Sequence, residues 1–457
     1  MYASTPNFDQ LTPSQCKNLL IEQPRTISDV VESHIQGNSE PLKLLSTRIK
    51  KIKLIRTEWT TIITTALDTI NKIAHAAATG HPQLLRALSP HLNNTSLSST
   101  EWKTIITSVP ETIGSISVAA TYGHHQLLRA LTPHLNNDFL SSTEWKTIII
   151  YEKATIGYIA AAAVKGRPAL LQSLAPHLNS DYLSSIEWKK IITARSDTIM
   201  CISFAVLNDH PQLFQALSPH LNDAFLSSTE WEKIITASPH TLLHIKGTTK
   251  KGHPQLLQAL ASHLNQIELC DGDVQLLKDV DPAIWTQIIT KNPALISAMA
   301  KGFTIGRTQM FKIIGPHLSH LNADNWYSIL TRDPSSILSI AKLSQTHHLR
   351  LIEKLSSSLD NITFSSGEWQ NIITESPSII YSLVLLKEKK CPTSLLENLL
   401  SQVHVMELTE EQWQAIFTDS SATVSAILLS ASSGNHNLLN VAIPHLSQSS
   451  AITWQNI

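Results

Sequence analysis

Histidine is the residue type whose number and spacing in this chain suggest chemistry. The sequence contains 21 histidines, and many of them form two series. Because imidazole binds metals and changes its charge near pH 6.5, one hypothesis is a row of metal sites and another is a pH-sensitive surface. The first series, mostly after a proline, is His91, His134, His177, His220, His263, His317 and His445; the second is His81, His124, His210, His253 and His348.

The regular spacing of these histidines favours a structural role. Equivalent side chains on neighbouring helices would lie ~8–10 Å apart, too far to share an ion held at ~2 Å. We therefore expect them to bond backbone carbonyls between repeats, and we predict no metal site and no cofactor. The four cysteines are far apart at unrelated positions, so neither a disulfide framework nor a cysteine zinc site is predicted.

Catalytic motifs are missing from the sequence. We find no P-loop, G-x-S-x-G, H-E-x-x-H, kinase signature or C-x-x-C. The sequence therefore predicts that the chain is not an enzyme. The alternative is an enzyme whose catalytic part lies beyond Ile457, which a longer open reading frame would support.

The spacing of the tryptophans indicates the repeated structure that holds the histidines in place. Most gaps between successive tryptophans are 43 residues, which indicates a solenoid of stacked supersecondary units. Isoleucines three and four residues further on indicate that the Trp lies in the core. The ten are Trp59, Trp102, Trp145, Trp188, Trp231, Trp285, Trp326, Trp369, Trp413 and Trp454.

Each repeat is predicted to contain three helices. A Ser-x-x-Glu capping box, Ser98 with Glu101 in one repeat, starts the Trp helix. The second helix starts near Pro110 and ends at Gly123, where a positive φ is expected. A leucine-rich third helix follows, and we expect a bend or an end at its Pro-His-Leu. We predict an all-α, right-handed α-solenoid of about ten three-helix repeats.

The run A-A-x-x-G-H-x-x-L-L-x-x-L, found at Ala119–Leu131 and Ala76–Leu88, resembles the paired helices of an ankyrin repeat. The T-P-L-H motif and the β-finger of that family are missing, and a Trp helix stands in place of the finger. Three helices in about 43 residues are instead similar to armadillo or HEAT repeats. Both resemblances imply protein binding.

The predicted organisation follows the repeats. We expect a flexible N-terminus at 1–10, a degenerate capping repeat at 11–54 with Cys16 in the Trp position, and five regular repeats at 55–265. An insertion or hinge at 266–280, read as a turn with an extra helix, precedes diverged repeats at 281–457 that end in a partial repeat. Residues 48–56, RIKKIKLIR, are the only basic cluster and are interpreted as a solvated helix end or as a patch for phosphate or an acidic partner.

Composition limits the partner classes. The net charge is −1 and only 16% of residues are charged, which makes nucleic acid an unlikely partner. The sequence shows no membrane span and no secretory signal, so a cytoplasmic location is predicted. The duplication, low charge and missing export signal resemble ankyrin-like effectors of intracellular bacteria, which implies secretion into a host cell cytosol and a host protein as partner. The oligomeric state is left open.

The second helices show a fixed frame with varied residues. At 13, 16 and 20 residues past the Trp, the side chains change from repeat to repeat, as expected of a solenoid face that binds a partner along a groove. Neutral drift at solvated positions is the alternative. The predicted partner-binding residues are Lys72, His75, Tyr122, Tyr158, Lys165, Phe204, His244 and Lys251. The leading hypothesis is a non-enzymatic protein-protein interaction scaffold; a nucleic-acid-binding helical-repeat protein is the second.

Overall fold

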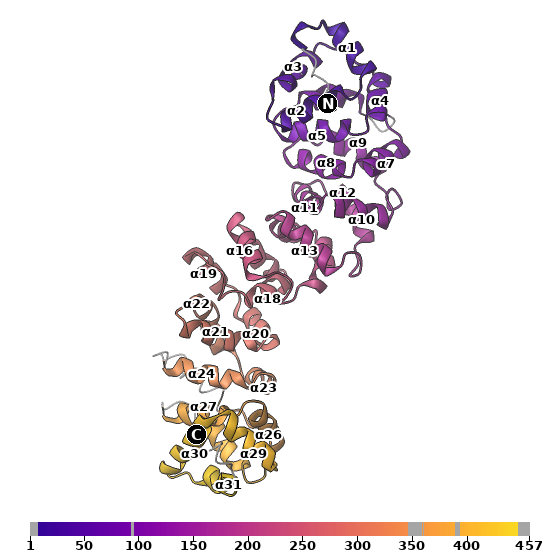
Figure 1. Ribbon diagram of the computed structural model, residues 1–457. Coiled ribbons are helices and arrows are strands. Elements are labelled where there is room, and N and C mark those ends of the chain that lie inside the picture. The colour runs from indigo at the N-terminus through magenta and orange to yellow at the C-terminus, as the bar shows by residue number, and fades with distance from the viewer. Residues whose placement is uncertain (1–7, 93–95, 346–358, 360, 389–393, 447–457) are drawn as a thin grey trace. The chain divides into compact units, whose positions relative to one another are not determined.

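The computed structural model describes residues 8–92, 96–345, 359, 361–388 and 394–446. Within these residues the chain is 72% helical and contains no strand, and neighbouring helices pack in series, as the predicted α-solenoid requires (Figure 1). The chain divides into two compact units, Met1–Leu256 and Leu257–Ile457. The boundary between the units lies about ten residues before the insertion or hinge that the sequence predicted at 266–280.

The Trp helices begin where the sequence predicted. Ser98 Oγ accepts from the Glu101 N–H, and a Glu101 carboxylate oxygen accepts from the Ser98 N–H, which closes the capping box. An Asn322–Asn325 box in the second unit was not predicted. These helices are α1 (Pro13–Glu22), α4 (Arg56–Thr65), α7 (Ser99–Ser108), α10 (Ser142–Tyr151), α13 (Ser185–Ala194), α16 (Ser228–Ala237), α20 (Pro282–Lys291), α23 (Ala323–Arg332), α26 (Ser366–Glu375) and α29 (Glu410–Asp419).

The second helices pack on one another from repeat to repeat, α2 on α5, α5 on α8, α8 on α11, α11 on α14 and α14 on α17. The predicted glycines after these helices have positive φ, and Asp209 adopts it without being glycine, at 64°. These helices are α2 (Thr26–Ile35), α5 (Thr69–Ala78), α8 (Glu111–Thr121), α11 (Thr155–Val164), α14 (Thr198–Leu207), α17 (Thr241–Lys250), α21 (Ala294–Thr304), α24 (Ser335–Gln345), α27 (Ile379–Glu388) and α30 (Ser421–Ser432).

The third helices end at the proline in the regular repeats. In the first four of them each α-helix stops before the proline and a short 3-10 turn carries the Pro-His pair, for example η2 (Ser89–His91) and η3 (Thr132–His134). The fifth has Ser262 in place of the proline. Pro444 is different, because it lies inside its helix near the C-terminal end. The third helices are α3 (Glu40–Ile49), α6 (Gln83–Leu88), α9 (Gln126–Leu131), α12 (Ala169–Leu174), α15 (Gln212–Leu217), α18 (Gln255–Ala261), α22 (Gln309–Ile314), α28 (Ser394–Gln402) and α31 (Asn437–Leu446).

The predicted core is confirmed. Every tryptophan from Trp59 to Trp413 is at most 2% exposed, and Cys16 is fully buried in the Trp position of the first repeat. Trp454 lies outside the described residues. At the N-terminus, Phe8–Gln10 forms a 3-10 helix (η1) whose Phe8 is fully buried, so the packed chain includes residues that the sequence assigned to a flexible segment.

The insertion contains the predicted extra helix, α19 (Asp271–Lys278), which packs against α22. The Leu277 carbonyl of α19 accepts a hydrogen bond of 3.1 Å from Trp285 Nε1. The insertion is therefore joined to the Trp helix that follows it in the second unit.

Candidate functional site

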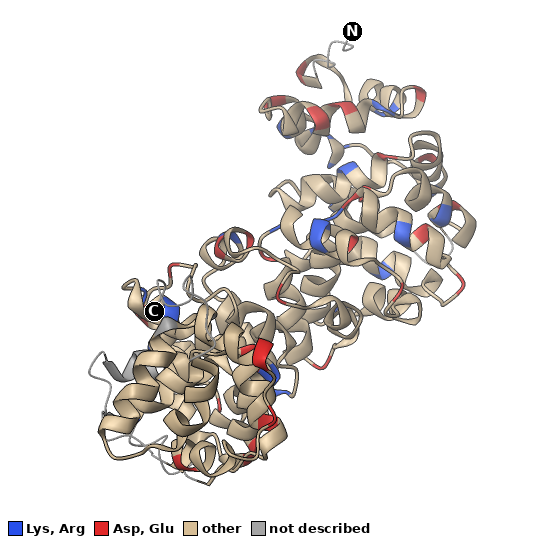
Figure 2. Cartoon of the chain, turned by 60° about the horizontal axis from the view of Figure 1, so that its bottom comes forward, with Lys and Arg blue, Asp and Glu red and all other residues tan. Residues whose placement is uncertain are grey.

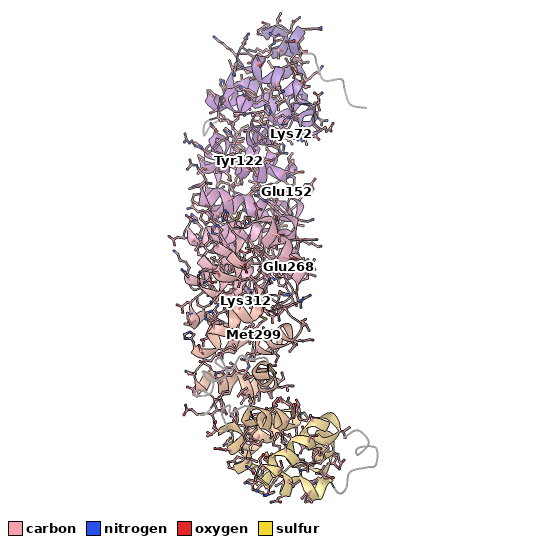
Figure 3. The ribbon with its side chains drawn as sticks, turned by 90° about the vertical axis from the view of Figure 1, so that its left-hand side faces the viewer. Lys72, Tyr122, Glu152, Glu268, Met299 and Lys312 are labelled. Carbon is pink, nitrogen blue, oxygen red and sulfur yellow. The ribbon has the colours of Figure 1, made fainter. Side chains whose placement is uncertain are left out.

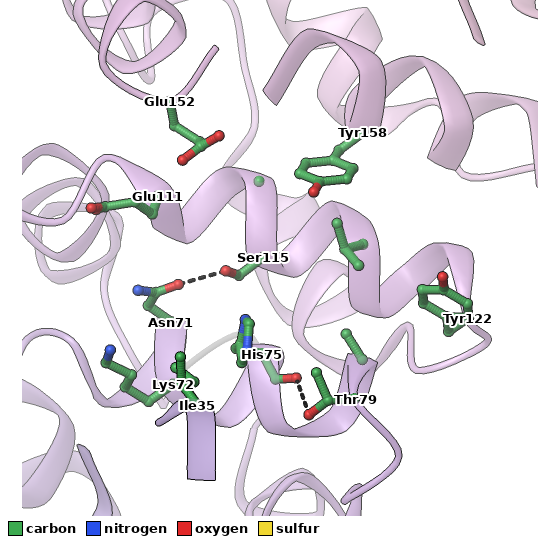
Figure 4. Close-up of a pocket in the computed structure, with 13 residues that line it drawn as sticks. Ile35, Asn71, Lys72, His75, Thr79, Glu111, Ser115, Tyr122, Glu152 and Tyr158 are labelled. Carbon is green, nitrogen blue, oxygen red and sulfur yellow. Dashed lines mark hydrogen bonds between the residues drawn. The ribbon is translucent and has the colours of Figure 1, made fainter. Parts of the chain in front are cut away.

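A pocket of about 500 Å³ opens on the second-helix face of the first unit (Figure 4). Four of the eight predicted partner-binding residues line it: Lys72, His75, Tyr122 and Tyr158. They come from three successive repeats, with Lys72 and His75 on α5, Tyr122 at the end of α8 and Tyr158 on α11. Figure 3 shows Lys72, Tyr122 and Glu152 following one another along the unit.

The pocket lies along the packed helices α5, α8 and α11, and a hydrogen bond joins the first two. Ser115 Oγ of α8 donates to Asn71 Oδ1 of α5 at 2.6 Å. Gly114 leaves space above this bond, because a Cβ there would lie 3.3 Å from Thr155 Oγ1 and 3.5 Å from Tyr158 Cδ2. The missing side chain thus keeps part of the pocket open.

Glu111 and Glu152 both line the pocket and lie on the same side of it in Figure 4, where the carboxylate of Glu152 points toward the other lining residues and that of Glu111 points outward. Glu152 also accepts a hydrogen bond of 3.2 Å from the Ala154 N–H. The cation of the pocket is already neutralised, because Lys72 Nζ lies 2.5 Å from Glu32 Oε2. The pocket therefore presents net negative charge.

His75 is neutral at physiological pH. Burial lowers its pKa, and the nearby positive charges of Lys72 and His34 lower it further against the opposing effect of Glu32. Since an imidazole in water titrates near pH 6.5, a lower pKa leaves the ring uncharged at pH 7. His75 can therefore offer a partner one hydrogen-bond donor and one acceptor, but no charge.

Two tyrosines frame the pocket in different ways. Tyr158 is held in place, because the Arg195 guanidinium lies 4.0 Å from the centroid of its ring and Arg195 itself bonds Asp197 at 2.6 Å. Tyr122 is 69% exposed at the C-terminal end of α8. One ring is thus preorganised, and the other is a large apolar surface open to solvent.

The remaining predicted residues do not reach this pocket. Phe204 and His244 stack on each other with ring centroids 4.6 Å apart, which joins α14 to α17. Lys251 Nζ forms an ion pair of 3.0 Å with Asp209. Lys165 is exposed at the C-terminal end of α11. They lie on the same series of second helices, one to three repeats further along the chain from α8.

The prediction that the histidines bond backbone carbonyls between repeats is confirmed for His220, which bonds the Ser180 carbonyl of the preceding repeat at 3.0 Å, but most of the bonds in this series are to serine hydroxyls. In three repeats the partner is a serine hydroxyl within the same repeat: Ser99–His134 at 2.9 Å, Ser142–His177 at 2.8 Å and Ser185–His220 at 2.9 Å. His220 and His317 also bond carbonyls, those of Ser180 and Lys278. His348 lies outside the described residues.

No group of three or more His, Cys, Asp or Glu side chains that could hold a metal ion occurs in the described part of the chain. The carboxylates of Glu111 and Glu152 were not predicted as site residues. Glu111 falls in register with Asp68 and Asp197 at the start of second helices, where a negative charge is favourable for the helix itself, so its spacing carried no functional signal.

Among the described helices, none is long and apolar enough to span a membrane by itself, while two pairs meet the length and composition requirements together and are bent by 103° and 98°. The chain was also compared with protein-family models, with curated proteins and with solved structures, and none of the three comparisons finds a match.

Proposed function

We propose that this chain is a non-enzymatic scaffold that binds another protein along the second-helix face of its first unit. The observation that supports the proposal most strongly is the convergence of Lys72, His75, Tyr122 and Tyr158 on one pocket. Drift at solvated positions gives no reason for varied residues of three repeats to surround a shared cavity. A pocket with aromatic residues at its edge is the usual form of an interface anchor site.

The chemistry of the pocket favours a partner segment that carries a lysine or an arginine. Glu111 and Glu152 supply carboxylates for charge-assisted hydrogen bonds, and neutral His75 adds no repulsion. Tyr122, Val118 and Ile35 supply apolar surface for the stem of such a side chain. The same carboxylates oppose a phosphate backbone, which weighs against the nucleic-acid alternative.

The partner segment is proposed to continue along the same face. Second helices of consecutive repeats lie side by side from α5 to α17, about 10 Å apart in packings of this kind. Lys165 and the Phe204–His244 stack follow the pocket on α11, α14 and α17. An extended segment that crosses several helices would contact each of them once.

The more specific form of the proposal is a bacterial effector that acts on a host protein in the host cytosol. The regular duplication of the repeats and the low content of charged residues support it. Ankyrin-like ancestry and the effector role are proposed from the sequence resemblance.

The test is an affinity pull-down from nuclease-treated eukaryotic lysate, read by mass spectrometry. The test variant carries Tyr122→Ala, Tyr158→Ala, Lys165→Ala and Phe204→Ala. A matched variant changes exposed residues of the Trp helices instead, Ile150→Ala, Tyr151→Ala, Ile186→Ala and Lys233→Ala. Circular dichroism melting first establishes that both variants fold.

The expected result is a protein that is enriched by the native chain and by the matched variant, and lost with the test variant. The same protein recovered with all three baits would place the binding surface elsewhere. Enrichment that appears only when nucleic acid is left in the lysate, and that falls steeply with salt, would replace the scaffold by the nucleic-acid alternative.

A further inference from the structure

A second pocket, of about 620 Å³, lies between the segment that joins α3 to α4 and the third helix of the next repeat. Its buried apolar floor includes Ile49, Ile52, Leu54 and Trp59, each at most 8% exposed. Ile55 stands at the edge and is 56% exposed. No residue lines both this pocket and the one on the second-helix face.

The ionisable groups that line this pocket are all basic. Lys50, Lys53, Arg86 and His91 contribute to its lining, and no aspartate or glutamate does. Within the part of the chain that the structure describes, Lys50, Lys53 and Arg86 belong to none of the ion pairs, whereas their neighbours are neutralised, Arg48 by Asp9 and Lys17 by Glu58. The lining therefore has unbalanced positive charge in a chain whose net charge is −1.

Comparison among the repeats indicates that the fold does not require this charge. Counting by 43 residues, Lys50 stands where the next repeats have Asn93 and Asn136, and Lys53 stands where they have Ser96 and Phe139. Ile55 occupies the position of the capping serines Ser98 and Ser141. The loop keeps the buried apolar residue, Leu54 in place of Leu97. Lys53 is exposed where the next repeats have a buried Ser96 or Phe139, and Ile55 is exposed where they have a capping serine.

We infer that this pocket, defined here as the Lys50–Arg86 pocket, binds an acidic segment of a partner protein that carries an apolar side chain between carboxylates. The apolar side chain lies against Ile55, Ile52 and Trp59, and the carboxylates pair with Lys50, Lys53 and Arg86. Charge complementarity supports this occupant. The concave shape favours a side chain that enters it over a flat bilayer surface, and the apolar floor favours it over a nucleic-acid backbone.

The experiment is a fluorescence anisotropy titration of the full chain with a labelled peptide, a Leu-Phe pair flanked on each side by glutamates. Two control peptides replace the glutamates by glutamine or the Leu-Phe pair by serines. The pocket variant carries Lys50→Gln, Lys53→Gln and Arg86→Gln. The matched variant, with the same loss of charge, carries Lys51→Gln, Lys153→Gln and Lys233→Gln, which are exposed residues that do not line the pocket.

We expect the acidic apolar peptide to bind more tightly than either control peptide. The affinity should fall about ten-fold in the pocket variant and stay within about two-fold in the matched variant, since three exposed ion pairs contribute modestly each. If both triple variants lose the same affinity for the peptide, the binding depends only on net charge and the proposal is wrong. The proposal is also wrong if the peptide does not bind the native chain.

Two further arms separate this occupant from other anionic partners. Phosphatidylserine vesicles and a single-stranded oligonucleotide are titrated in place of the peptide. If either binds more tightly than the peptide and loses that binding in the pocket variant, the pocket serves a membrane or a nucleic acid and the proposal is wrong. The Ile55→Ser variant adds an independent arm: it keeps every charge and should still weaken the peptide several-fold.

Discussion

Lys103 Nζ of α7 lies 2.9 Å from Glu144 Oε2 of α10, and that same carboxylate accepts from the Ser141 N–H in its own capping box. One side chain therefore caps a helix and joins it to the preceding repeat. The arrangement recurs in Lys146–Glu187 at 3.1 Å and Lys189–Glu230 at 2.8 Å. Figure 2 shows acidic and basic residues interspersed on the helices, as such a ladder produces.

The double role of Glu144 predicts unequal effects of removing the two partners. Lys103→Met removes only an ion pair whose lysine side chain is 40% exposed, which should cost at most about 1 kcal/mol. Glu144→Ala removes the pair and half of the capping box, so we expect a cost of about 1–2 kcal/mol. Urea denaturation followed by circular dichroism measures both, and equal costs would contradict the double role.

The ladder also predicts sensitivity to acid. Burial by itself raises the pKa of Glu144, but the Ser141 N–H, Lys103 and the Ser141 hydroxyl together outweigh it, so that the pKa is lowered; the same holds at Glu187 and Glu230. A lowered folded-state pKa means that the stabilisation is complete above the unfolded value of about 4.3 and is lost as the pH falls through the folded pKa. The melting temperature should therefore drop below about pH 4.3, and Glu144→Gln should reduce that drop.

Gly114 is predicted to control the width of the pocket on the second-helix face, which Lys72, His75, Tyr122 and Tyr158 line. Gly114→Ala places a methyl group 3.3 Å from Thr155 Oγ1 and 3.5 Å from Tyr158, which narrows the cavity, while alanine favours the helix by up to about 1 kcal/mol. Partner affinity should fall about ten-fold with little change in melting temperature. Gly157→Ala is the matched control, because its Cβ meets Thr198 Oγ1 at 3.2 Å and Gly157 does not line the pocket.

The ionisation of His75 should make binding at the pocket on the second-helix face depend on pH. Below its lowered pKa the ring gains a positive charge, which faces Lys72 and His34 and, with opposite sign, Glu32. A cationic partner segment would then bind roughly three- to five-fold more weakly at a pH below this lowered pKa than at pH 7.5. Isothermal titration at the two pH values measures the change, and His75→Gln should abolish it.

The same ionisation affects folding in a defined direction. Because the folded-state pKa of His75 is lowered, the unfolded chain takes up the proton first as the pH falls. The stability contributed by neutral His75 is thus present above about pH 6.5 and is lost as the pH falls through the folded pKa. A binding assay below the lowered pKa must therefore include a melting curve, so that lost affinity is not confused with lost folding.

The Ile55→Ser variant should raise the stability of the chain although it weakens peptide binding. An isoleucine has no side-chain acceptor for the orphan N–H groups at the start of α4, and only the Ile55 N–H to Glu58 Oε2 bond of 2.8 Å is made. Ile55→Ser restores the missing half of the capping box and should stabilise the chain by about 0.5–2 kcal/mol. Thermal melting checks this. A destabilised variant would contradict the cap assignment.

The sequence by itself determined everything that depends on local or periodic signals. Capping residues such as Ser98 and Glu101 interact within one helical turn, and Gly123 needs only its own φ, so the helix boundaries followed from a few neighbouring residues. The 43-residue period of Trp102 and Trp145 determined the repeat and its buried core, because equivalent residues of each repeat pack in the same way against the neighbouring repeats.

Only the tertiary structure decided which side chains of different repeats meet. Lys72 and Tyr158 share a pocket, Lys103 reaches Glu144, and Phe204 stacks on His244. Such pairs join residues one or two repeats apart, and they depend on the rotation and shift between neighbouring repeats, which a sequence period does not specify. For the same reason Glu111 and Glu152 were not recognised from the sequence as parts of one site. They are 41 residues apart, so they do not occupy equivalent positions of the 43-residue repeat, and only the fold places them at the same pocket.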